Sequence, residues 1–245
     1  MDNKELKYVP GAYHKKRPDA CTVANQYTGK WEQQLRKKEK AFPAKMSSTI
    51  CFSRKIGVGA LEIADLLAEK IGYSVADREI LDCIAKDAKM SKKCIDFFDE
   101  RYPGKMSELS SMFFKKKSFL MSDYVRYLFG AVFSIADLGP TIFVGRGVHL
   151  IMPRHWVLAV RFVSSKAHRV NRLAGILKVK EEDAERIVDQ HDKEQKEFFK
   201  KAFGKKDASP YEFDMVINCD HIKEPKWAAE IVARAYKEKF DGEAS

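Results

Sequence analysis

Residues suited to binding an anion follow four of the β-prone segments of this 245-residue chain. They are Gly57 with Gly59, Asp77 with Arg78, Gly145-Arg146-Gly147, and Asn218 with Asp220. Glycine turns expose backbone N–H groups, and an arginine presents five donors in a planar head, so the chemistry indicated is phosphate binding. Ligands of open parallel sheets bind beyond the carboxyl ends of the strands. We therefore expect these residues to lie at one site.

The stretch "SRKIGVGALEIADLLAEKIG", residues 53–72, reads as a strand, a glycine turn and an amphipathic helix. In the standard phosphate loop GxxxxGK[ST], backbone N–H groups cradle the phosphates, Lys reaches the outer phosphates and Ser/Thr holds magnesium. Here Gly59 is followed by Ala60, Leu61 and Glu62, and Lys55 is the nearest cation in sequence. The alternative is that G-x-G provides only tight-turn geometry. The residues expected to cradle nucleotide phosphates are Ser53, Arg54, Gly57, Val58, Gly59 and Ala60.

The charged residues of these segments can each be interpreted either as binding residues or as structural ones. Arg169 and Arg172 share a helix face and either clamp an anion together or belong to an ordinary solvated face. Arg146 either binds phosphate or forms a surface ion pair, and between two glycines it is expected to contribute little to the core. Asp77 and Arg78 either bind an acceptor or cap the next helix.

The hydrophobic pattern predicts alternating strands and helices. Strands are expected at 48–53, 73–77, 140–145, 156–163 and 213–219; helices at 60–71, from residue 78, over much of 91–139, at 165–178, at 180–203 and from about Pro225 to Phe240. Strands separated by helices indicate an α/β fold with a parallel sheet covered on both faces.

Residues 1–45 differ from the rest, since they hold 11 Lys or Arg and 5 Asp or Glu of a chain with net charge +10. We expect a basic N-terminal arm, 1–45, before one domain, 46–245, with a short helix through "KWEQQLRKKEK", 30–40. The arm is either a solvated tail or a segment whose aromatic residues, such as Tyr27 and Trp31, anchor it on its own domain or on a protein partner.

The five cysteines show no CxxC pair, the N-terminus does not resemble a signal peptide, and the longest apolar run is too short for a membrane span. We expect a soluble, cytoplasmic protein with reduced thiols, several of them buried, and no membrane partner.

The segments "ICFSRKIGVGALEIADLLAEKIGYSVADREIL", "IFVGRGVHLIM", "SSKAHRVNRLA", "VDQHDKEQKEFFKKAFG" and "YEFDMVINC" resemble, in their order and spacing, the cytidylate kinase-like family of nucleoside monophosphate kinase folds. The resemblance covers roughly residues 48–240. It implies a three-layer P-loop kinase-like domain with a helical lid-like segment, and ATP and Mg²⁺ as cofactors. The implied activity is phosphoryl transfer from ATP to a nucleoside monophosphate, such as CMP, or a related small acceptor.

The enzymatic hypothesis gives catalytic roles to Arg146, Arg169 and Arg172, and acceptor binding to Asp77, Arg78 and Arg146. Lys55, beside the loop, is the candidate replacement for the lost loop cation. Compared with a classical cytidylate kinase loop, the chain has Ala60 in place of the catalytic Lys and Glu62 in place of the Ser/Thr. Compared with the family's own loop, where Glu62 is a match, "GR" has become Ala60-Leu61, and in the lid-like segment Gln195 replaces an arginine. The second hypothesis is therefore a catalytically impaired, kinase-like regulatory or structural subunit. RNA binding through the arm and Lys115–Lys117 is a third and disfavoured alternative, because no RNA-binding motif accompanies these lysines.

Overall fold

A five-stranded parallel sheet with strand order β2-β3-β1-β4-β5 organises the computed structural model, which describes residues 11–36, 47–101, 123–206 and 208–240. Its strands are β1 (Thr49–Arg54), β2 (Ser74–Asp77), β3 (Thr141–Val144), β4 (Val157–Val163) and β5 (Met215–Asn218). In the register, Phe52 of β1 lies opposite Val144 of β3 and Val160 of β4. The expected α/β class and parallel sheet are confirmed, with each strand within a few residues of its predicted place.

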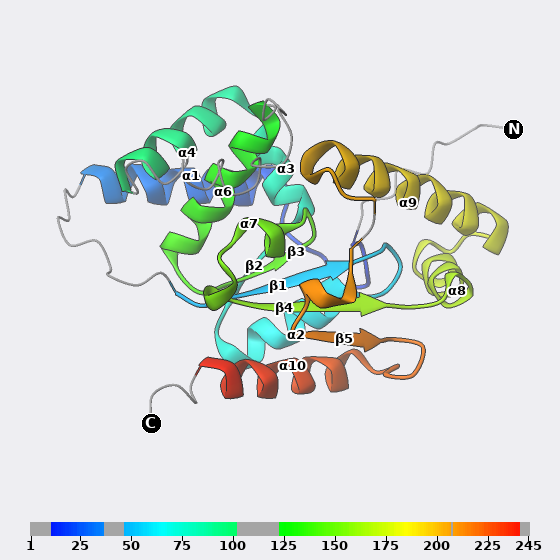
Figure 1. Cartoon of the computed structure of the whole chain (residues 1–245). Coiled ribbons are helices and arrows are strands. Elements are labelled where there is room, and N and C mark those ends of the chain that lie inside the picture. Colours follow the sequence, from blue (N-terminus) through cyan, green and yellow to red (C-terminus); the bar gives the residue numbers. More distant parts are fainter. Residues whose placement is uncertain (1–10, 37–46, 102–122, 207, 241–245) are drawn as a thin grey trace, which may run out of the picture.

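Helices cover both faces of the sheet, as Figure 1 shows. Below it in that view lie α2 (Ala60–Ile71) and α10 (Pro225–Phe240); above it lie α3 (Arg78–Lys86), α6 (Asp123–Leu138) and α7 (Val148–Ile151), with α1 (Ala20–Arg36) and α4 (Ala88–Arg101) further out. At the carboxyl ends of the strands stand α8 (Lys166–Leu177) and α9 (Glu181–Phe203), where the lid-like segment was expected. Two short 3-10 turns, η1 (Arg154–Trp156) and η2 (Pro210–Glu212), complete the described elements.

Successive residues of the central strands are buried against opposite layers, which explains their nearly continuous apolar sequence. In β1, Ile50 and Phe52 pack with α2 and α10, whereas Cys51 packs with the helices on the other face. β1 is buried along its whole length. The end of this strand, and the loop that follows it, are thus held rigidly from both sides.

The described part of the arm packs on the rest of the chain. Helix α1 begins at Ala20, ten residues before the predicted helix, while residues 37–40 of that prediction lie outside the described residues. Tyr27 and Trp31 are buried in the core that α3 and α6 share, and Trp31 Nε1 donates a hydrogen bond of 3.0 Å to the Ser134 carbonyl. A solvated tail is therefore wrong for residues 20–36. Hydrophobic periodicity does not indicate the first half of this helix, because its buried positions include the polar residue Thr28 and the helix contains Gly29.

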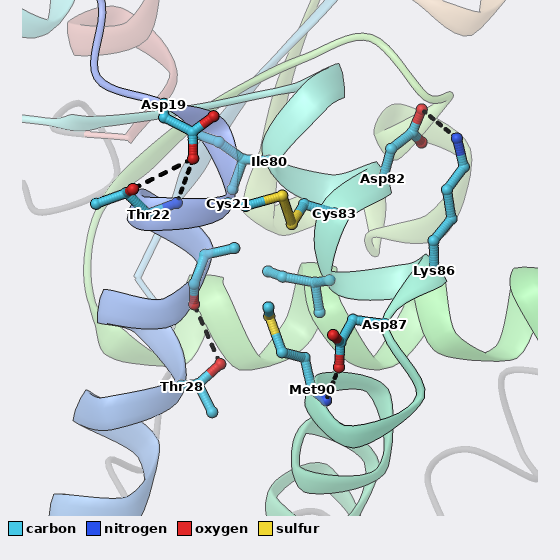
Figure 2. The surroundings of a disulfide bond; sticks show 12 residues. Asp19, Cys21, Thr22, Thr28, Ile80, Asp82, Cys83, Lys86, Asp87 and Met90 are labelled. Carbon is cyan, nitrogen blue, oxygen red and sulfur yellow. Dashed lines mark hydrogen bonds and ion pairs between the residues drawn. A yellow bond between two sulfur atoms is a disulfide. The ribbon is translucent and has the colours of Figure 1, made fainter.

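The expectation of reduced thiols is wrong for two of the five cysteines. Cys21 of α1 forms a disulfide with Cys83 of α3, which Figure 2 shows between the two helices. The remaining three, Cys51, Cys94 and Cys219, are free and buried, as expected. The docking of α1 on α3 joins two thiols 62 residues apart, and no local spacing in the sequence encodes such a pair.

No helix in the described ranges combines the length and apolar character needed to cross a membrane. Lys115–Lys117 lie outside the described residues.

Candidate functional site

The glycine turn after β1 forms a tight loop directly beneath helix α8. Gly57 and Gly59 adopt left-handed backbone conformations, with φ of 79° and 84°. A Cβ atom on Gly57 would lie 2.8 Å from the Arg169 carbonyl oxygen, and one on Gly59 would lie 3.1 Å from Arg172 Nε. The backbone conformation favours glycine at both positions, and at Gly57 the space below the Arg169 carbonyl requires it as well. At Gly59 a Cβ would press on the guanidinium end of Arg172.

The loop delivers the chain into the N-terminus of α2. Gly59 is the N-cap residue, and it has no side chain to cap the first turn. A helix N-terminus with backbone N–H groups and a positive dipole end favours an anion. Val58 and Ala60 are buried beside it, so their side chains hold the loop in the core. Ser53 and Arg54 are also buried, at the end of β1.

The arginines above the loop each have a carboxylate partner. Arg172 Nη2 donates to Glu62 Oε2 at 2.6 Å. Arg169, only 3% exposed, forms a two-pronged ion pair with Asp192 of α9, with both contacts at 2.9 Å. The two arginines share α8 but point to different acids, and only the Arg172 side chain reaches Gly59. Arg169 ties α8 to α9, and its Nη1 also donates to the Ile56 carbonyl of the loop at 3.4 Å.

Helix α9 closes the other side of the loop. Lys55 Nζ lies 3.6 Å from Asp192, the same carboxylate that Arg169 binds. Gln195, which replaces an arginine of the family pattern, donates from Nε2 to the Arg54 carbonyl at 2.9 Å. These contacts hold α9 against the carboxyl end of β1.

Arg146 is a structural residue as well as a site candidate, which corrects the expectation that it adds little to the core. Its backbone is left-handed, with φ of 51°, and its guanidinium makes a two-pronged ion pair with Asp82 in which Nε and Oδ1 are 2.6 Å apart. The same carboxylate accepts from Tyr124 Oη at 2.6 Å, and burial raises the pKa of Tyr124. The guanidinium also lies 4.4 Å from the centre of the Phe198 ring. Arg146 thus connects α3, α6 and α9 below the glycine turn that carries it.

Asp77 caps a helix. Its Oδ1 accepts a 3.1 Å hydrogen bond from Ile80 N at the start of α3, and its other oxygen lies 3.8 Å from Nε of Arg17 in the arm. Arg78 Nε lies 3.6 Å from Asp82 and 3.7 Å from Glu79, whose pKa is raised by burial. Of the two interpretations offered for this pair, the structure contains the capping contact.

The residues after β5 also have a structural function. Asp220 accepts hydrogen bonds from Ser164 Oγ at 2.6 Å and from the Ser165 backbone N–H. The Ser164 hydrogen bond lowers the pKa of Asp220. This carboxylate therefore fixes the turn from β4 into α8, and so helps to position α8 next to the glycine loop.

Two small cavities flank the loop and bring most of the expected residues together. One, of about 40 Å³, is lined by Ser53, Arg54, Arg78, Gly145, Arg146, Gly147 and side chains of α9. The other, of about 20 Å³, lies between residues 54–62, Arg172 and the arm residues 11–13. Such volumes hold a few water molecules. The contribution of the arm to the loop, and the acids that pair with each arginine, were missed in the sequence because they lie far from it along the chain.

The loop suits a phosphate better than it suits a protein-bound metal ion. A Cβ would fill the cradle at Gly59, and Arg172 lies over it. The Ser/Thr of a standard loop is replaced by Glu62, which Arg172 engages, and the described residues contain no group of three or more His, Cys, Asp or Glu side chains that could hold a metal. We therefore assign no step to a metal held by side chains.

Comparison with known proteins agrees with this architecture. The sequence profile of the cytidylate kinase-like family matches residues 49–221. No curated protein is significantly similar to the chain in sequence. An uncharacterized protein from Eubacterium ventriosum ATCC 27560 has a similar structure, with a TM-score of 0.59 and 19% identity over 78% of this chain and 98% of that one, which supports the fold alone.

Two further solved structures align more loosely. Shikimate kinase from Bacteroides thetaiotaomicron is 14% identical, with a TM-score of 0.39 over 80% of this chain and 99% of that chain. TT1252 from Thermus thermophilus is 17% identical, with a TM-score of 0.43 over 78% and 98% of the two chains.

Proposed function

Because the chain belongs to the cytidylate kinase-like family, we propose that it binds ATP at the loop Gly57–Ala60 and transfers the γ-phosphoryl group to a nucleoside monophosphate, such as CMP, or a related small acceptor. The observation that carries this proposal is the left-handed glycine cradle at the N-terminus of α2 with Arg172 directly over it. Magnesium would arrive bound to the triphosphate and neutralise part of its charge.

The chain's residues would divide the work between donor and acceptor. Backbone N–H groups of the loop hold the donor phosphates, and Arg172 exchanges Glu62 for a phosphate oxygen. Arg78 and Arg146, which line the cavity on the β3 side, bind the acceptor. An acceptor oxygen attacks the γ-phosphorus, the bond to the bridging oxygen breaks, and ADP leaves.

Catalysis along these lines requires α8 and α9 to move. The two loop cavities measure about 40 and 20 Å³, too small for a nucleotide, so entry of ATP must separate these helices from the loop. The ion pair of Lys55 with Asp192 joins the loop to α9 and would break on opening, whereas the pair of Arg169 with Asp192 joins α8 to α9 and would keep the two helices together. Lid closure of this kind excludes water from the transferring group.

A second function is favoured by a separate observation. Ala60 and Glu62 stand where a classical cytidylate kinase loop has its lysine and its Ser/Thr. Ala60-Leu61 also replaces the "GR" of the family's own loop, and Gln195 replaces an arginine of the family pattern. Loss of one group that stabilises the transition state commonly costs on the order of 100-fold in rate. A catalytically impaired subunit that retains nucleotide binding would then regulate or support a larger assembly. ATP binding without transfer to any monophosphate would favour this alternative.

The experiment compares Gly59→Ala with Gly72→Ala, the glycines at opposite ends of α2. Both have left-handed backbones, with φ of 84° and 71°, but a Cβ meets Arg172 at position 59 and nothing within 4 Å at position 72. Calorimetric titration with ATP, with and without Mg²⁺, should show binding weakened by about tenfold or more in Gly59→Ala, which is about 1.4 kcal/mol. Gly72→Ala should bind like the natural sequence. Equal affinity of both variants, or no ATP binding by the natural chain, would remove the loop from this function.

A further inference from the structure

We propose that a basic cavity beside the phosphate loop binds a second anionic group, a phosphate or a carboxylate, on the small acceptor. This inference rests on the proposed function and adds the class of acceptor to it. The basic cavity is the space lined by Lys55, Arg161, Lys193, Lys196 and Lys206, with Asp192 at its wall.

The basic cavity has the size and place of a ligand site. Its volume is about 510 Å³, within the range of small-molecule pockets, whereas the two cavities at the loop hold only a few waters. It lies where α9 crosses the carboxyl ends of β1 and β4, the end of a parallel sheet at which ligands bind. Gln195 and Phe199 line both this space and the small cavity that contains Arg146. The two cavities are therefore neighbours, with Gln195 and Phe199 between them, and an acceptor bound at Arg146 would lie beside the basic cavity.

The charges around this space are unbalanced. Among the described residues that line this space, five side chains are cationic and one, Asp192, is acidic, and Asp192 is already bound by Arg169. Within the described ranges, Lys193, Lys196 and Lys206 have no acidic side chain at ion-pair distance. Cations gathered around a concave surface raise the local concentration of anions. An anion of two or more charges is the ligand that this arrangement favours.

Arg161 gives the basic cavity a directed donor in addition to mobile lysines. It extends from β4, its Nη1 lies 3.4 Å from Ser53 Oγ, and its guanidinium lies 5.6 Å from the centre of the Phe213 ring. Ser53 is the first residue of the phosphate-loop sequence, so the same strand end connects the two sites. A planar guanidinium fixed in this way recognises the oxygen pair of a carboxylate or a phosphate.

The test separates the basic cavity from the loop by working in the Gly59→Ala protein, where loop binding is weakened. Pyrophosphate and citrate serve as probes for phosphate and carboxylate groups in calorimetric titrations at matched ionic strength. Substitution of Lys193 and Lys196 by Gln should weaken binding of the preferred probe by about tenfold or more, because two charge-assisted contacts are lost. The control replaces two lysines on α10, Lys226→Gln with Lys237→Gln, which changes the net charge equally outside the cavity and should leave binding unchanged.

Three outcomes overturn the proposal: neither probe binds, the cavity and control variants lose affinity equally, or a single-stranded RNA binds more tightly than both probes and depends on the same lysines. The first two results leave ATP binding by the natural chain unaffected, so failure of the basic cavity is distinguishable from failure of the proposed function. Circular dichroism of each variant confirms that exposed Lys→Gln changes preserve the fold.

Discussion

At the scale of single residues, Arg146 shows the largest difference between the role predicted from the sequence and the contacts in the structure. Its partner Asp82 is 5% exposed and also accepts from Tyr124, so removal of the guanidinium leaves a buried carboxylate with weaker partners. We expect Arg146→Ala to lower the free energy of unfolding by about 3 kcal/mol, as for other broken buried pairs. Urea denaturation measures this loss. If transfer occurs, the same change should slow it by about 100-fold at a temperature where the variant is folded.

The matched control for Arg146 is a double-mutant cycle with Asp82→Ala. If the pair stabilises the fold, the double variant should lose less stability than the sum of the two single variants. Strictly additive losses, or a single variant as stable as the natural sequence, would contradict the structural role. Loss of transfer in a variant of unchanged stability would instead assign Arg146 to the acceptor alone.

At the scale of elements, periodicity and turn chemistry were enough to predict the strands and most helices. The sheet segments are short apolar runs ending in glycine or polar residues, and the closing helix was predicted at its observed bounds, Pro225–Phe240. Helix α1 was only half predicted, because its buried stripe includes small and polar residues and its partners are tertiary.

For the candidate site, the sequence likewise predicted which residues follow the strands but not which side chains they contact. The sequence placed Gly57, Gly59 and Arg146 after the ends of strands, and the structure shows that these strands, β1 and β3, are neighbours. It could not supply the acids opposite the arginines: Asp82 is 64 residues from Arg146, and Glu62 is 110 residues from Arg172. Such pairs depend on how helices pack, which local pattern does not determine. These acids bear on the proposed transfer, since each neutralises a cation to which that proposal gives a role.

The helix α1 gives the prediction at this scale. Trp31 is 1% exposed, is stacked against Tyr27 with ring centres 6.4 Å apart, and donates to Ser134. We expect Trp31→Ala to lower the free energy of unfolding by about 3–5 kcal/mol, since it leaves a large cavity between α1 and α6. Trp31→Phe, which keeps most of the volume but loses the hydrogen bond, should lose less. A thermal melt of both variants measures the order, and a natural-like melting temperature for Trp31→Ala would show that the arm is a loosely attached segment.

At the scale of the whole molecule, the arm is fastened to the domain at several points that are distant in sequence. Arg17 Nη1 binds Asp65 of α2, Lys15 Nζ lies 2.7 Å from Glu69, and Tyr13 donates to Asp65. Residues 11–13 then line the cavity at the phosphate loop. The described part of the arm therefore packs on the domain and also lines the cavity at the glycine loop.

The disulfide between α1 and α3 also holds the arm on the domain, and it stabilises the folded state by restricting the unfolded chain. Cys21 and Cys83 close a loop across the arm, β1, α2 and β2, with a sequence separation of 62, so the bond limits the conformations of the unfolded ensemble. Under oxidising conditions, we expect the Cys21→Ser, Cys83→Ser double variant to be about 2–4 kcal/mol less stable than the natural chain. Dithiothreitol should lower the melting temperature of the natural chain to near that of the double variant, and should leave the double variant unchanged. Equal melting temperatures of the two proteins without reductant would show that the bond adds no stability and that the noncovalent contacts of the arm suffice.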